Sequence, residues 1–375
     1  MGRSRVWTLL VCLLTTLAAW GGEGVSSMRT RGIRYLLACQ EGAGSWMGAV
    51  GHPAMTALAV MGIYGTPDYQ SSEDIQRCVG KALDYIVSNA REDGGIYRPR
   101  GDGQSAAAGG YAVYNTSICL LALATCNRPG DVPVMRKARA YLMGSDAIPD
   151  ASGGFGYGSK TRADLNNTAW ALDAIQATDH LDREPFTSDP TAAKRADLAW
   201  ENALKFVTMC QNLKATNQSA WVASAPESDA GGFIYCPQEA LQDKAPARAL
   251  RSYGSMTYSG LKSLIYAKVK PDDARMVSAL DWVRRNYTLD SNPGVGQAGL
   301  FYYFHTFAKT LSLLKQDTLT DAKGVSHAWK SELAARLASL QRKDGSWCNE
   351  RSGRWMESIP QLATAYCLMA IQYLE

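Results

Sequence analysis

The hydrophobic and polar residues of this chain repeat as a unit of one helix, a glycine turn and a second helix. In the last copy the first helix ends at Gln341, the turn Gly345-Ser346-Trp347 follows, and the second helix starts near Thr364. The first helices place apolar residues at i, i+3, i+4 and i+7 with charges between them, which indicates one buried face. The second helices carry few charges, which is typical of helices covered on both sides. Clear examples of these charge-poor segments are 54–64, 116–124 and 168–177.

Six copies of this unit can be traced, and each is marked by a glycine turn followed by a threonine. The turns begin at Gly44, Gly94, Gly153, Gly231, a degenerate stretch from Gly294 to Gly299, and Gly345, and the threonines are Thr56, Thr116, Thr168, Thr257, Thr306 and Thr364. An open array of such hairpins needs polar capping repeats, and the first and last copies lack them. The repeat therefore predicts an all-α fold, an α/α toroid of about six helical hairpins in which inner helices are ringed by outer helices.

The start of the chain indicates export. Residues 1–23 have the form of a secretory signal, with Arg3 and Arg5 before an apolar run over 6–20 and small residues over 18–22. The apolar run is shorter than the ~20 residues of a membrane-spanning helix. We expect a signal peptide over 1–23, a single toroid domain over 24–375, and a periplasmic or extracellular protein with no stable membrane span.

Composition narrows the function classes. Hydrophobic residues make up 46% of 375 residues, and the formal net charge is only +4. No run of Lys and Arg is long enough for a nucleic-acid groove. Eight of the nine cysteines follow the signal, and most lie in apolar helical patterns, so we expect buried thiols. We expect a monomer.

Two segments share a longer motif. Gln40, Gly44 and Trp46 have the same QxxxGxW spacing as Gln341, Gly345 and Trp347. This pair resembles the motif of squalene and oxidosqualene cyclases, and the whole repeat resembles the prenyltransferase/squalene-oxidase repeat of the terpene cyclase and protein prenyltransferase superfamily. The segments Arg251–Ala267 and Tyr302–Leu311 are similar to its exported, single-toroid bacterial members. The resemblance implies a central aromatic cavity for an isoprenoid.

The catalytic motifs of that superfamily are incomplete here. Asp164-Leu165-Asn166-Asn167-Thr168-Ala169 is similar to the DxDD-T-A motif, but Asn166 stands at the position of the acid, and an amide cannot protonate an alkene. The zinc ligands of protein prenyltransferases correspond to Tyr253, Ser255 and His305, of which only the histidine can hold zinc. One ligand does not make a zinc site, so we expect no metal and no cofactor.

The residues just before the repeat threonines are expected to surround the centre of the ring. The candidate ligand-binding residues are Tyr114, Asn166, Asn167, Arg251, Tyr253 and Tyr302. The repeat aromatics that follow the turns, by contrast, are expected to support the packing. These aromatics are Trp46, Tyr97, Phe155, Phe233 and Trp347.

A second group is the candidate catalytic set. Tyr302, His305 and Lys309 lie at i, i+3 and i+7 on one helix face. A lysine in an apolar helix needs an acid, and Glu357 is the expected partner of Lys309. We expect Tyr253, His305, Lys309 and Glu357 to converge in one pocket, with His305 or Tyr303 as acid or base. The alternative is that they form a satisfied core network.

Three function classes follow. The first is an exported terpenoid-cyclase-like or prenyltransferase-like protein that binds or transforms an isoprenoid or other lipid-like ligand, as a transferase or isomerase with a non-standard site if it is an enzyme. The second is a non-catalytic periplasmic or extracellular binding or scaffold toroid. The third, a carbohydrate-active toroid, is disfavoured because the inner helices carry few carboxylates for a paired-acid mechanism.

Overall fold

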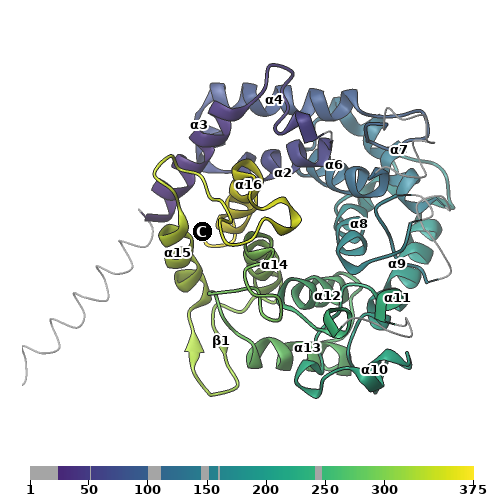
Figure 1. Cartoon of the computed structure of the whole chain (residues 1–375). Helices are drawn as coiled ribbons and strands as arrows, with labels where there is room; N and C mark the ends of the chain where they lie inside the picture. The colour runs from purple at the N-terminus through teal and green to yellow at the C-terminus, as the bar shows by residue number, and fades with distance from the viewer. Residues whose placement is uncertain (1–23, 51, 100–110, 145–151, 159–160, 241–246) are drawn as a thin grey trace, which may run out of the picture.

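The helices form two concentric rings (Figure 1). The computed structural model describes residues 24–50, 52–99, 111–144, 152–158, 161–240 and 247–375. The inner ring consists of α2 (Pro53–Ile63), α6 (Ala112–Cys126), α8 (Leu165–Ala177), α12 (Gly254–Tyr266), α14 (Leu300–Leu313) and α16 (Pro360–Ile371). The outer ring consists of the helix over 24–39, α4 (Glu73–Ser88), α7 (Val132–Met143), α9 (Ala192–Met209), α13 (Ala274–Arg285) and α15 (Trp329–Leu340).

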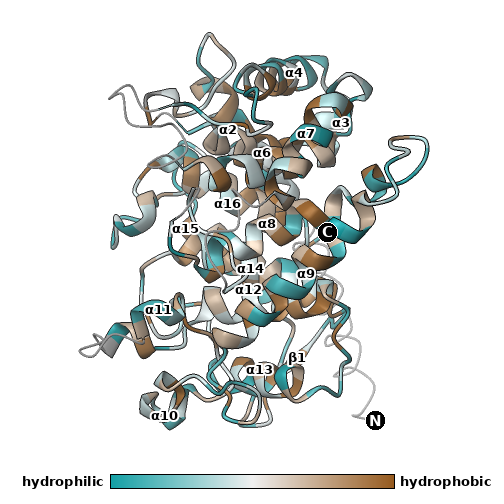
Figure 2. Ribbon diagram, turned by 90° about the vertical axis from the view of Figure 1, so that its right-hand side faces the viewer, coloured by the Kyte–Doolittle hydropathy of each residue, from teal (hydrophilic) through white to brown (hydrophobic). Residues whose placement is uncertain are grey.

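Short elements connect the two rings. They are α3 (Pro67–Ser71), α10 (Trp221–Ser224), α11 (Pro237–Ala240), the antiparallel strands β1 (Leu319–Thr320) and β2 (Ser326–His327), and the 3-10 turns Gly48–Val50, Pro129–Asp131, Asp179–Asp182, Glu227–Asp229, Ala247–Leu250 and Arg354–Met356. Every residue of α2 is buried, whereas α4 buries a single face. Figure 2 shows that α4 and α9 mix hydrophilic and hydrophobic residues along their length, as helices with one buried face do. The charge pattern of the sequence thus correctly separated inner from outer helices.

The repeat glycines bring each turn against the next outer helix. Gly44, Gly94, Gly153, Gly231 and Gly345 all have φ between 80° and 94°, in the left-handed region that favours glycine. At each of them a Cβ would lie closer than 3.0 Å to a backbone carbonyl oxygen of the outer helix that follows in the ring. For Gly345 that carbonyl belongs to Arg31 in the first helix, so the last copy packs against the first.

The repeat threonines fasten each turn to its inner helix. In five copies the threonine hydroxyl accepts a hydrogen bond from the backbone N–H of the residue just after the glycine turn. The pairs are Trp46 with Thr56, Ile96 with Thr116, Phe155 with Thr168, Phe233 with Thr257, and Trp347 with Thr364. The fifth copy departs from this rule, because Thr306 donates to the carbonyl of Tyr303 instead. The Asn292 side chain fastens that copy by accepting from the backbone N–H of Ser255.

The glutamines of the QxxxGxW motif join neighbouring repeats. Gln40 Nε2 donates to the carbonyl of Gly44 within its own turn and to that of Cys78 in the next outer helix. Gln341 repeats this pattern, but its second acceptor is the carbonyl of Met28 at the start of the chain, 2.9 Å away. The α16 helix also packs along α2. The ring is therefore closed, and the all-α toroid expected from the sequence is confirmed.

The core contains the aromatics and most of the thiols. The repeat aromatics are buried as expected, since Trp46, Phe155, Phe233 and Trp347 have no exposed surface and Tyr97 is 5% exposed. All eight cysteines of the described residues are unpaired, and six of them are buried. Among the described residues, no helix is both long and apolar enough to span a membrane.

Candidate functional site

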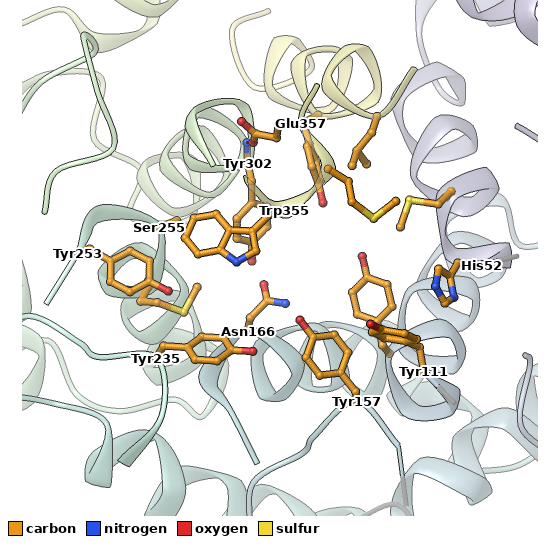
Figure 3. Close-up of a pocket in the computed structure, with 16 residues that line it drawn as sticks. His52, Tyr111, Tyr157, Asn166, Tyr235, Tyr253, Ser255, Tyr302, Trp355 and Glu357 are labelled. Atoms are coloured by element: carbon orange, nitrogen blue, oxygen red, sulfur yellow. The ribbon is translucent and has the colours of Figure 1, made fainter. Parts of the chain in front are cut away.

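A cavity of about 260 Å³ lies where the inner helices begin (Figure 3). Each inner helix, or the segment that leads into it, contributes to its wall. Seven tyrosines dominate the lining, namely Tyr111, Tyr114, Tyr157, Tyr235, Tyr253, Tyr302 and Tyr366. The remaining lining residues are His52, Met55, Asn166, Ser255, Met256, Trp355, Met356, Glu357 and Leu362. The wall is thus aromatic and thioether-rich, with a few polar groups.

The tyrosine rings pack edge to face around the wall. Tyr111 lies 4.5 Å from the His52 ring and 4.8 Å from the Tyr157 ring, at interplanar angles of 74° and 86°. Burial raises the pKa of Tyr114, Tyr157 and Tyr302 above the ordinary value. Their phenols therefore stay protonated at neutral pH and offer neutral hydroxyl groups to a ligand.

Asn166 is a polar group of the described wall that is free to bind a ligand. Among the described residues its side-chain amide has no hydrogen-bond partner, and Figure 3 shows it pointing toward the middle of the cavity. Asn167, in contrast, faces away from the cavity, because its Nδ2 donates to Asp164 Oδ2 at 2.6 Å. Asp164 Oδ1 also accepts from the Asn167 backbone N–H at 2.8 Å and thereby caps α8.

Asp164 is itself a perturbed carboxyl group behind the wall. Burial raises the pKa of Asp164 to about 6, against hydrogen bonds from Asn167 and Tyr235 that favour its ionised form. Tyr235 lines the cavity and hydrogen-bonds Asp164, which is not itself among the lining residues. This carboxylate is therefore close to the site without forming part of its surface.

Glu357 is the single carboxylate of the described lining, and it holds the start of α14. Its Oε1 accepts from the Tyr302 backbone N–H at 2.7 Å, and its Oε2 accepts from Asn349 Nδ2 at 2.9 Å. Burial raises the pKa of Glu357, and the bonds from Asn349 and from the first turn of α14 oppose that rise. Glu357 lies where the N-terminal end of a helix favours negative charge.

The expected pair between Lys309 and Glu357 is wrong. Lys309 Nζ lies 2.9 Å from Asp173 Oδ2, and Lys262 Nζ lies 2.6 Å from the same oxygen. The physical reason is the position of Lys309 along the helix. Lys309 follows Tyr302 by seven residues and so lies about 10 Å farther along α14. Glu357, at the start of that helix, bonds the backbone of Tyr302 instead.

The expected convergence in one pocket is also wrong. Tyr253 and Glu357 line the cavity, but His305 and Lys309 do not. The His305 ring stacks on Trp170 with centroids 5.8 Å apart and an interplanar angle of 9°. Burial and the nearby lysines hold the pKa of His305 well below its usual value, so the ring is neutral.

Two further candidates also lie away from the cavity. Tyr303 is buried, and its hydroxyl donates to the Thr288 carbonyl at 2.8 Å. Arg251 is half exposed, and its Nε lies 3.0 Å from Asp229 Oδ2. Of the ten candidate residues, the cavity brings together Tyr114, Asn166, Tyr253, Tyr302 and Glu357 and leaves out the other five, which are Asn167, Arg251, Tyr303, His305 and Lys309.

Sequence reasoning missed the segment that covers the cavity. Trp355 and Met356 both have positive φ, 57° and 65°, in residues that rarely adopt it. The Trp355 ring stacks on Tyr253 with centroids 6.2 Å apart, and it lies against Gly299, where a Cβ would touch the indole. Sequence offered one signal, a tryptophan just before the last inner helix with no place in the repeat.

A metal centre is not formed in the described part of the chain, where no three His, Cys, Asp or Glu side chains gather. No family model matches the sequence. No curated protein matches it either.

Solved structures do match the fold. The type II terpene cyclase MstE from Scytonema matches in two complexes, one with merosterolic acid A (TM-score 0.53, 13% identity) and one with geranylgeranyl dihydroxybenzoate (TM-score 0.52, 14% identity). Each match covers 94% of this chain and 97% of the other. The chain has a terpene cyclase-like fold.

A second match shows that the fold alone does not identify the activity. An α-amylase from Clostridium perfringens matches with a TM-score of 0.54 and 11% identity, over 93% of this chain and 98% of the other. Proteins with different named activities thus share this toroid. The matches show a terpene cyclase-like fold and nothing finer, and the activity must be argued from the cavity.

Proposed function

We propose that this protein binds a small hydrophobic ligand, isoprenoid or otherwise lipid-like, in the tyrosine-lined cavity at the centre of its ring. The observation that carries the proposal is the lining itself, in which seven tyrosines, one tryptophan and three methionines enclose about 260 Å³. Apolar cavities with few polar groups are typical small-molecule sites. Asn166, whose amide is free among the described residues, supplies a polar anchor for a hydroxyl or carbonyl group of the ligand.

The proposed activity is binding without proton-initiated cyclisation. Asn166 occupies the position that the motif reserves for the acid, and its amide cannot give a proton to an alkene. A paired-acid glycosidase mechanism lacks support too, because it needs two carboxyl groups and Glu357 is the single carboxylate of the described lining. Glu357 is also bonded to Tyr302 and Asn349, which favours a supporting role.

The proposal extends to where the protein works. We propose an exported monomer: the signal-like residues 1–23 support export, and the closed ring, whose last copy packs against the first, supports a monomer. Cell fractionation with an antibody against the chain tests the location, and size-exclusion chromatography with light scattering tests the monomer.

A cavity-filling variant tests the binding. Met256 lines the cavity and is 2% exposed. Calorimetric titration with farnesol should show saturable binding to the parent protein and about tenfold weaker binding to Met256→Trp, whose indole fills the space. Val277→Trp is the matched control, because it adds the same indole at a position on α13 that is 43% exposed. Unchanged farnesol affinity in Met256→Trp would place the site elsewhere.

A further inference from the structure

The buried carboxylates of this protein fall into two classes. Three of the buried acids of the described residues have a cation within ion-pair distance. The pairs are Asp131 with Arg128, Asp173 with Lys262 and Lys309, and Asp229 with Arg251. The other two buried acids, Asp164 and Glu357, are each 1% exposed and make no ion pair among the described residues. Both lie at the central cavity, one behind Tyr235 and one in the wall.

Buried charges are normally paired, so two unpaired carboxylates around one cavity need a reason. Helix ends supply part of it. Asp164 caps α8, and Glu357 accepts from the first turn of α14. A helix N-terminus carries only about half of one positive charge, which leaves negative potential around the cavity. Arg162 lowers the pKa of Asp164, yet its guanidinium is bonded to Glu239 at 2.7 Å.

The described lining of the cavity contains no lysine or arginine, and His52 is its single imidazole. Asn115 Oδ1 accepts from the Ala54 N–H, so its Nδ2 is the atom that faces His52 Nδ1 at 3.4 Å. This contact fits the tautomer of His52 in which Nδ1 accepts.

The aromatic faces add to the same preference. A cation over the face of a tyrosine or tryptophan ring is attracted by the electrons of the ring. Tyr253 and Trp355 stack nearly parallel on one side of the cavity. The guanidinium of Arg354, outside the lining, already lies 4.7 Å from the centroid of the Trp355 ring.

We infer that the ligand of this cavity carries a positive charge, as a tertiary or quaternary ammonium group on a hydrophobic body. The inference rests on the proposed function and adds the charge of the ligand to it. Neutral phenols, aromatic faces and two carboxylates without cation partners favour such a group. The same arrangement disfavours a phosphate, diphosphate or carboxylate, which would meet no lysine or arginine in the described lining.

Three probes of one shape test the charge. They are phenyltrimethylammonium, its uncharged isostere tert-butylbenzene, and the anion benzenesulfonate, each titrated by calorimetry. We expect the cation to bind about tenfold more tightly than the uncharged isostere, and the anion most weakly. Glu357→Gln should weaken the cation about tenfold and leave tert-butylbenzene unchanged. Glu350→Gln, at an exposed position of the same loop, should change neither.

Each outcome separates this inference from the proposed function. Equal affinities for the cation and its isostere, or tighter binding of the sulfonate, overturn the charge assignment and leave the cavity as a binding site. Binding of no probe and no farnesol overturns both. If Glu357→Gln loses its thermal transition, Asp164→Asn replaces it, because asparagine keeps the acceptor that caps α8 and removes the charge.

Discussion

Lys309 Nζ lies 2.9 Å from Asp173 Oδ2, although the two side chains belong to inner helices that are not consecutive in the ring. Lys262, from the helix between them, reaches the same oxygen at 2.6 Å. One carboxylate therefore joins α8, α12 and α14 below the cavity. Burial opposes the ionised form, but both lysines act the other way and hold the pKa of Asp173 below its ordinary value.

The first prediction concerns this joint. Asp173→Asn should lower the free energy of unfolding by about 3–5 kcal/mol, because it leaves two buried ammonium groups without their anion. Urea denaturation measures the change. Asp317→Asn is the control, since its carboxylate is 89% exposed and 3.4 Å from Lys330, and an exposed pair contributes at most about 1 kcal/mol. A loss below about 1 kcal/mol in Asp173→Asn would contradict the structural role.

The second prediction concerns the close approach of the repeat turns. Gly231→Ala forces a side chain into φ of 89° and against the Ser278 carbonyl, whereas Gly296→Ala, at φ of 63°, meets nothing within 4 Å. The left-handed conformation alone costs about 1–2 kcal/mol at both sites. We expect Gly231→Ala to lose about 2 kcal/mol more than Gly296→Ala, because overpacking adds about 1–3 kcal/mol. Equal losses in thermal or urea unfolding would show that the turn can move away.

The ring could be predicted from the sequence because its rules are local. Gly44, Thr56 and Gln40 each act through one turn or one neighbouring helix, and the same chemistry recurs at fixed spacing along the chain. Closure was predicted because the first and last copies lack polar caps, and in the structure Gln341 and Gly345 contact the first helix. Because the same local contacts recur in each copy, the sequence was enough to predict the whole ring.

The site could be predicted only in part, because it depends on depth and on departures from the repeat. Asn166 and Tyr253 were found since they precede repeat threonines. Lys309 was predicted to pair with Glu357 because the two residues have similar positions in the repeat. Position in the repeat does not say how far along the inner helix a side chain lies. The observed partner of Lys309 is Asp173, the single carboxylate within the apolar helix α8. That isolated carboxylate was the feature of the sequence that could have predicted the pair. Trp355 owes its place to an unusual backbone conformation.

The third prediction separates support from contact in two tryptophans. Trp347 has no exposed surface, and its indole N–H donates to the Leu337 carbonyl at 2.9 Å. Trp347→Ala should therefore cost about 3–5 kcal/mol of stability, the range for a buried large aromatic, and leave farnesol affinity in the folded protein unchanged. Trp355 is 40% exposed and lines the cavity.

Trp355→Gly gives the matched comparison. Glycine accepts the positive φ of that position, so stability should change by less than about 1 kcal/mol as the lost packing and the relieved strain offset each other. Affinity for farnesol should fall about tenfold, since the cavity loses one aromatic wall. Urea unfolding measures the stability of the two variants, and calorimetry measures their affinity for farnesol. If Trp347→Ala lost farnesol affinity and Trp355→Gly lost stability instead, Trp347 would be the ligand contact and Trp355 the packing support.

The fourth prediction is a pH dependence that originates at Asp164. Its pKa is about 6 in the folded protein and 3.8 in the ordinary state of the group. The folded state therefore binds the proton more tightly, so this group's contribution to stability falls as pH rises from about 4 to 6 and is constant above. At about 1.4 kcal/mol for each pH unit between the two values, the ionised carboxylate costs roughly 3 kcal/mol at neutral pH. Arg162 keeps its charge and Tyr157, Tyr235 and Tyr253 keep their protons throughout this range, so they do not mask the effect.

Asp164→Asn isolates that contribution. Asparagine keeps an oxygen that accepts from the Asn167 N–H, so the α8 cap survives while the titration disappears. The stability of the variant relative to the parent should rise by roughly 2–3 kcal/mol between pH 4 and pH 7, with most of the change between pH 4 and 6. Asp189→Asn is the control, because hydrogen bonds from Thr191 and Arg195 hold the pKa of that exposed carboxyl at about 2, and its difference from the parent should stay flat over the same range. Urea denaturation at four pH values gives both curves. Parallel curves for Asp164→Asn and the parent would mean that Asp164 titrates normally and that burial does not raise its pKa.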